Sequence, residues 1–179
     1  MAAPRTYAAL LRGINVGGAR KVSMAELAGV FAALGHEDVS TYIQSGNVVF
    51  SSSKAERAIA PALEAAIDER FGLDVRVMIR SHDELAAIAA GNPFGDARGV
   101  HVVFLERAPA KSARLDPDRS PGDAFALVGR ELYLQLPTGA GRTKLTLGYV
   151  ETQLGVAGTQ RNWNTLLRLI ALTEPATAG

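Results

Sequence analysis

The chain has no cysteine among its 179 residues. This absence excludes disulfides, thiolate nucleophiles and thiolate metal ligands, and with them a small secreted domain held by disulfides. The segment MAAPRTYAALLRG has no long apolar stretch, and no run of about 18 uncharged apolar residues occurs anywhere. We therefore expect a cytoplasmic protein with no membrane partner.

The chain also lacks an excess of charge of either sign, since its formal net charge is only +1. No global field attracts the protein to nucleic acid or anionic lipid, so any preference for anions must be local. The composition is 47% apolar and 21% charged, which is typical of a globular protein and argues against disorder. The length allows one large domain or two small ones.

The first half of the chain alternates between patterns typical of strands and helices. Its predicted elements are a strand over 6–11, a helix opened by a Ser23–Glu26 capping box, strands over 39–43 and 47–51, a helix capped at Ser53, and a strand over 74–80. This β-α-β-β-α-β order is typical of a ferredoxin-like plait. The sequence therefore predicts an α+β protein whose first half, residues 1–81, is ferredoxin-like.

The second half, residues 82–179, reads as a degenerate copy of the first followed by a C-terminal helix. Its predicted elements are a short helix capped by Ser81 and Glu84, strands over 100–105, 124–128 and 131–136, and helices over 110–115 and 147–154. Thr159 is expected to cap the last helix, with Trp163, Leu166, Leu167 and Ile170 as its apolar stripe. We expect this helix to pack back on the first half.

The loop in LLRGINVGGARKVSM, residues 10–24, is a candidate anion site. Gly13 and Gly18 have the spacing of a phosphate-binding Walker A loop, but Ala19 and Arg20 stand where that loop needs lysine and a hydroxyl. A G-x-G-x-x-G dinucleotide motif is also missing. Glycine-rich backbone and a following helix start can still cradle an anion. The alternative is that the glycines only permit a tight turn.

Topology places a second polar segment beside this loop. In a β-α-β-β-α-β plait the first and third strands are antiparallel neighbours. The end of the first strand should therefore lie next to the start of the third. We expect one sheet edge to carry residues from both segments, namely Arg12, Asn15, Gly17, Gly18, Lys21, Tyr42, Gln44, Ser45 and Asn47.

The stretch GTQRNWNTLL, residues 158–167, adds a third group of candidates. Arg161, Asn162 and Trp163 lie where the last helix is expected to begin, at the positive end of its dipole. Lys144 contributes a further cation shortly before. A tryptophan in this position is more often an anchor of the core than a platform for a ligand.

Side-chain catalysis receives little support from the sequence. The three histidines lie in unrelated segments, and no histidine pair or carboxylate cluster has metal-ligand spacing. Ser45 is not in a G-x-S-x-G elbow. RNA recognition of the RRM type is weakly supported, since its aromatic motif is missing and aromatics make up 6% of the chain. We therefore predict no metal site and assign no catalytic residue or cofactor.

Several motifs in order resemble the DUF1697 family of bacterial proteins. They are LLRGINVGG, TYIQSGNVVF, the NPF near residue 93, the Thr-Lys-Leu at 143–145 and TQRNWNTLL. The resemblance implies an α+β protein built from ferredoxin-like halves and implies no activity. Gln160 stands where the usual pattern has threonine.

The leading hypothesis is a binding protein for an anionic ligand, either a phosphorylated small molecule, a nucleotide or the backbone of a nucleic acid. In it Arg12, Lys21, Lys144 and Arg161 supply positive charge, the amide and hydroxyl side chains orient the ligand, and Tyr42 and Trp163 offer flat surfaces. One alternative is an enzyme that uses arginine and backbone electrostatics. Another is a structural or protein-interaction module. The sequence leaves the oligomeric state open.

Overall fold

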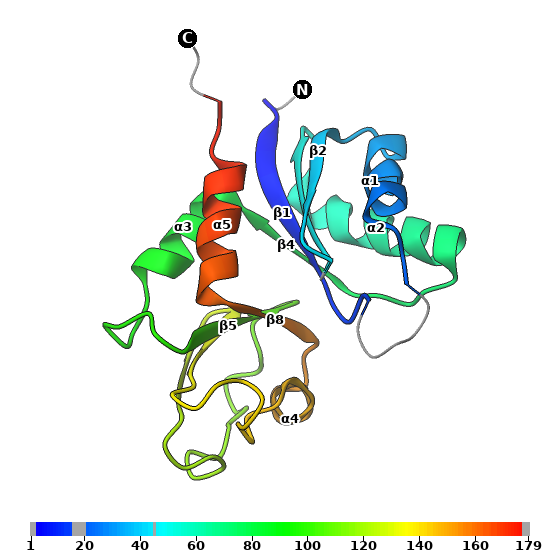
Figure 1. Ribbon diagram of the computed structural model, residues 1–179. Coiled ribbons are helices and arrows are strands. Elements are labelled where there is room, and N and C mark those ends of the chain that lie inside the picture. Colours follow the sequence, from blue (N-terminus) through cyan, green and yellow to red (C-terminus); the bar gives the residue numbers. More distant parts are fainter. Residues whose placement is uncertain (1–2, 16–20, 45, 177–179) are drawn as a thin grey trace. The chain divides into compact units, whose positions relative to one another are not determined.

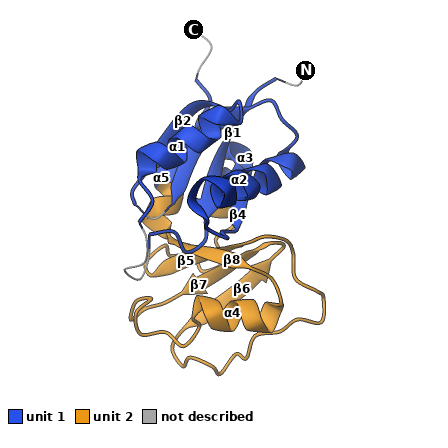
Figure 2. Ribbon diagram, turned by 90° about the vertical axis from the view of Figure 1, so that its right-hand side faces the viewer, with its two compact units in different colours: residues 1–86, 168–179 blue, residues 87–167 orange. Residues whose placement is uncertain are grey.

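The computed structural model of the chain describes residues 3–15, 21–44 and 46–176. Within these residues it contains two four-stranded antiparallel sheets and five helices. The chain divides into two compact units, residues 1–86 with 168–179, and residues 87–167 (Figure 2). The predicted α+β class is confirmed. The proposed division into 1–81 and 82–179 stays a prediction.

The first sheet has the strand order β2-β3-β1-β4. Its elements, in chain order, are β1 (Arg5–Leu11), α1 (Met24–Ala33), β2 (Glu37–Tyr42), β3 (Asn47–Ser52), α2 (Glu56–Phe71) and β4 (Val77–Ser81), with α3 (His82–Ala90) following. This order agrees with the ferredoxin-like prediction. Figure 1 shows α1 and α2 together on one face of this sheet.

Local signals explain where these helices begin. Ser23 Oγ accepts a hydrogen bond from the backbone N–H of Glu26 at 3.4 Å, as the predicted capping box requires. Ser81 and Glu84 form the reciprocal box that opens α3, at 3.2 and 2.8 Å. The predicted cap of α2 at Ser53 is wrong, because that helix begins after Ala55 without a side-chain cap. Burial of its apolar face stabilises α2 instead.

The core of the first unit lies between the sheet and these two helices. Alternate strand residues and the inner faces of α1 and α2 form one apolar cluster, which includes Tyr7, Phe31, Phe50, Ile59 and Leu63. Phe31 and Phe50 meet edge to face with ring centroids 5.2 Å apart. This cluster fixes the sheet against the helices and so positions the strand ends that carry the N-terminal motifs.

The second sheet has the equivalent order β6-β7-β5-β8. Its unit contains β5 (Val100–Leu105), β6 (Ala124–Val128), β7 (Glu131–Gln135), α4 (Leu147–Leu154) and β8 (Gly158–Asn162), and α5 (Trp163–Thr173) follows. The helix predicted over 110–115 is wrong, since this segment contains a turn and otherwise has no regular secondary structure. Six residues are too few to form a stable helix alone, and here only Leu115 is buried in the core.

The strand β8 corrects a second prediction. Thr159 does not cap the last helix, because it is buried in β8 opposite Phe104 of β5. The cap is Asn162, whose Oδ1 accepts a hydrogen bond from the backbone N–H of Thr165 at 2.8 Å. The predicted apolar stripe also shifts, since Leu167 is 47% exposed and Leu169 is buried.

The described helices include none that is both long enough and apolar enough to span a membrane.

Candidate functional site

The end of β1 lies beside the β2–β3 hairpin, as the topology predicted. Leu10 is in register with Asn47, and the backbone N–H of Leu11 donates to the carbonyl oxygen of Gly46 at 2.9 Å. Asn15 Nδ2 donates to the carbonyl oxygen of Gln44 at 3.2 Å. The structure thus joins two of the predicted polar segments within the first unit. Three predicted site residues, Gly17, Gly18 and Ser45, lie outside the described residues.

The side chains of two asparagines at this edge form hydrogen bonds with the backbone of nearby loops. Asn15 has a left-handed backbone, with φ of 57°. Its side chain accepts from the N–H of Val22 at 2.7 Å and donates to the carbonyl oxygen of the same residue at 3.0 Å. Asn47 is fully buried, and its Nδ2 donates to the carbonyl oxygen of Tyr42 at 3.1 Å. Both amides therefore close loops, which favours the tight-turn interpretation of this segment.

Positive charge is exposed in the same unit. Arg12 and Lys21 are solvent-exposed, and the backbone N–H of Arg12 donates to the carbonyl oxygen of Arg76 on the neighbouring chain segment at 2.9 Å. The guanidinium of Arg168 lies 6.0 Å from the ring centroid of Tyr42, at the outer limit of a cation–π contact. Tyr42 is therefore already covered in part by a cation.

A second group of predicted residues borders a cleft in the second unit. The cleft has a volume of about 360 Å³ and is lined by Asp96, Ala97, Arg98, Gly99, Val100, His101, Asn162, Trp163 and Asn164. The pairing of β5 with β8 brings the two stretches together, because His101 is in register with Asn162. Of the predicted site residues, Asn162 and Trp163 line this cleft.

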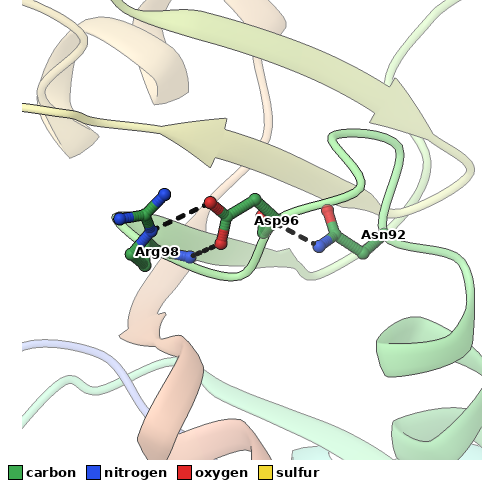
Figure 3. A network of polar contacts seen from close by, with 3 residues as sticks. All are labelled: Asn92, Asp96 and Arg98. Atoms are coloured by element: carbon green, nitrogen blue, oxygen red, sulfur yellow. Dashed lines mark hydrogen bonds and ion pairs between the residues drawn. The ribbon is translucent and has the colours of Figure 1, made fainter.

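The loop on one side of the cleft is organised by its own side chains (Figure 3). Asp96 accepts from the backbone N–H of Arg98 and from its Nε, each at 2.9 Å. Asn92 Nδ2 donates to the carbonyl oxygen of Asp96 at 3.3 Å. The hydrogen bond from the Arg98 backbone, and then that from its side chain, lower the pKa of the exposed Asp96 carboxyl. Arg98 uses Nε for this contact and remains 92% exposed, so its outer nitrogens face solvent.

His101 lines the cleft and is held by a hydrogen bond to β8. Its Nδ1 lies 3.2 Å from Nε2 of Gln160, which is an amide donor. Nδ1 therefore accepts, and the proton of the neutral ring lies on Nε2. Burial lowers the pKa of His101, so the ring is neutral at pH 7. The cleft thus contains one carboxylate and one guanidinium, whose charges cancel.

The start of α5 supplies the other side of the cleft. Asn162 caps the helix, and the first-turn N–H groups of Trp163 and Asn164 have no partner inside the helix. Asn164 is exposed and Trp163 is half-buried. An electroneutral cleft that holds a helix N-terminus, an arginine and several amide or ring N–H groups is suited to hydrogen-bond acceptors and anions.

The remaining two predicted residues have other surroundings. Arg161 is buried in β8, where its Nη1 donates to Thr159 Oγ1 at 2.6 Å and to the carbonyl oxygen of Gln160 at 2.9 Å. Burial lowers the pKa of Arg161 to about 10, which still leaves it charged at pH 7. Lys144 is exposed, and its backbone N–H donates to Ser120 Oγ at 3.0 Å. The prediction that these groups share one site stays a prediction.

Comparison with known proteins assigns the chain to a family. Residues 5–133 match the family described as "Protein of unknown function (DUF1697)". The chain belongs to the DUF1697 family. A solved structure described as that of the conserved bacterial protein SP0830 from Streptococcus pneumoniae has a TM-score of 0.72 and 24% identity, covering 96% of this chain and 100% of that chain. This likeness shows the shared fold. A search of curated proteins found no match.

For this DUF1697 member, sequence reasoning missed the side of the cleft formed by residues 96–101. Asp96, Arg98 and His101 were not predicted, although the turn-rich segment 91–99 contains charged residues next to a strand. The missing signal was β8, since its pairing with β5 is what joins this segment to Asn162. Among the described residues, no group of three or more metal-ligating side chains occurs.

Proposed function

We propose that the cleft of the second unit binds a phosphorylated small molecule of about nucleotide size. The observation that carries the proposal is the convergence of two distant stretches, 96–101 and 162–164, on one volume of about 360 Å³. Arg98 would contact the phosphate together with the N–H groups at the start of α5. Trp163 would pack against a flat group of the ligand, and the amides of Asn162 and Asn164 would orient it.

Two features favour a small molecule and a binding role. The volume suits a ligand of a few tens of atoms, whereas a nucleic acid would require an extended basic surface. His101 presents its Nε2 proton, because Nδ1 is occupied by Gln160. In this tautomer His101 serves as a donor to a ligand oxygen and not as a general base.

The test measures binding of inorganic phosphate, nucleoside monophosphates and the matching nucleosides by calorimetry and thermal shift. Removing Arg98 deletes one charge-assisted hydrogen bond, worth about 1.5 kcal/mol, so Arg98→Ala should weaken nucleotide binding about tenfold. Asn164→Ala should weaken it by a smaller factor. Arg142→Ala, in an exposed loop of the same unit, is the matched control and should bind normally.

Two results would overturn the proposal. The first is the absence of any binding to millimolar concentrations of these compounds. The second is binding that Arg98→Ala and Asn164→Ala leave unchanged. If Arg12→Ala abolished binding instead, the site would belong to the N-terminal loop.

A further inference from the structure

In the part of the chain that the structure describes, four strands form the edges of the two sheets, and three of them are less open than the fourth to pairing with another strand. Strand β2 carries Glu37 and Asp38, and its register with β3 shifts between Glu37 and Ser40. Charges and a bulge at an edge both oppose intermolecular pairing. In β4 four of the five residues are buried, and in β8 three of the five are buried. Residues buried in this way leave less of the backbone open to a further strand.

Strand β6 is the fourth edge and lacks such protection. Its sequence, AFALV, contains no charge and no proline, and it pairs with β7 in a continuous register. Leu127 is 40% exposed and Val128 is 56% exposed. Within the described residues β6 has β7 as its one strand neighbour. An exposed, regular and fully apolar edge strand is a template for β-pairing.

The hairpin geometry shows which backbone groups this edge offers. Gly129 and Arg130 form the two-residue turn, Gly129 has φ of 61°, and Val128 is the last residue paired, with Glu131. The pair that closes such a hairpin is hydrogen-bonded, and bonded and non-bonded pairs alternate from there. Phe125 and Leu127 therefore direct their N–H and C=O groups away from β7.

We propose that β6 pairs with β6 of a second copy of this chain, antiparallel about a two-fold axis at Ala126. This register places Phe125 of each copy opposite Leu127 of the other, so the outward N–H and C=O groups of both residues are satisfied. It also covers the exposed Leu127 side chains. Recognition of a strand from another protein would require side-chain pockets or charges, and β6 provides neither. A second copy of β6 is equally apolar, and a two-fold axis places the same surface of each copy against the other.

The size of the contact sets the expected strength. The two strands gain two bonded residue pairs over five residues. A contact this short buries less than the roughly 800 Å² per partner that is typical of a stable interface. We therefore expect a weak dimer with a dissociation constant on the order of 100 μM. The proposal is independent of the cleft, which involves other residues.

The test is sedimentation equilibrium on the full chain between about 10 μM and 1 mM. Leu127→Lys places a charge at each half of the interface and should weaken dimerisation by at least about tenfold. Leu167→Lys is the matched control, because Leu167 is 47% exposed but lies on α5. It should dimerise as the wild type does. Circular dichroism and melting temperature check that both variants fold.

A second measurement needs no variant. Hydrogen exchange at the amides of Phe125 and Leu127 should slow as protein concentration rises, while exchange at Ala126 should not change. The proposal fails if the chain stays monomeric to 1 mM, if Leu127→Lys dimerises like the wild type, or if exchange at Phe125 and Leu127 is independent of concentration.

Discussion

Replacing Gly46 by alanine tests how the N-terminal loop is held against the β2–β3 hairpin. Gly46 has φ of 78°, and a Cβ there would lie 2.3 Å from Ile14 Cγ2 and 3.0 Å from Leu11 Cβ. Both neighbours are buried, so neither can move into free space. The left-handed backbone costs an alanine about 1 kcal/mol, and the overlap adds about 1–3 kcal/mol. We expect Gly46→Ala to lower the free energy of unfolding by about 2–4 kcal/mol.

The assay is urea unfolding of Gly46→Ala beside Gly139→Ala. Gly139 has φ of 88°, and a Cβ there would meet nothing within 4 Å, so the control reports backbone strain alone. It should cost about 1 kcal/mol. Ile14→Ala in the Gly46→Ala background should be less destabilising than Ile14→Ala alone, because the clashing methyl is gone. Equal costs for Gly46→Ala and Gly139→Ala would refute the reasoning.

Three further predictions concern polar groups that are buried or half-buried. Burial, and then the charge of Lys54, lower the pKa of His36 below its unfolded value of about 6.5. Its contribution to stability is therefore present above pH 6.5 and is lost as the pH falls through the folded pKa, and His36→Gln should flatten the melting temperature measured between pH 8 and 5. Tyr133→Phe removes the hydroxyl that donates to the carbonyl oxygen of Ile88 at 2.7 Å, and should cost about 1–3 kcal/mol in urea unfolding. Asp123→Ala removes the carboxylate that accepts from the Thr143 hydroxyl at 2.6 Å, and should lower the melting temperature by several degrees. An unchanged melting temperature would show that this hydrogen bond does not stabilise the fold.

The elements that could be predicted are those whose signals are local. The helix after Ser23 has a capping box, a regular apolar stripe and a glycine at its end, and it was located closely. The β6–β7 hairpin has an apolar run on each side of Gly129-Arg130, and both strands were found. Interactions between residues that are close in the sequence determine such elements, so they can be predicted from the sequence alone.

The elements that could not be predicted depend on distant partners. Strand β8 consists of Gly158, Thr159, Gln160, Arg161 and Asn162, a composition with few strand formers. It is a strand because β5 offers it a hydrogen-bonding edge, which no local pattern reveals. The cleft was missed for the same reason. Part of the N-terminal edge was predicted, since it follows from strand order alone.

The discontinuity of the first unit has a consequence for the emergence of the chain from the ribosome. Residues 168–179 belong to the unit that begins at the N-terminus, and His82 Nδ1 meets Thr173 Oγ1 at 3.1 Å. That contact cannot form until Thr173 has been synthesised, whereas residues 87–167 are contiguous and are all synthesised earlier. The usual N-to-C order of folding during synthesis is thereby broken. Of the two compact units, the one whose first residues are synthesised earlier is also the one whose last residues are synthesised later.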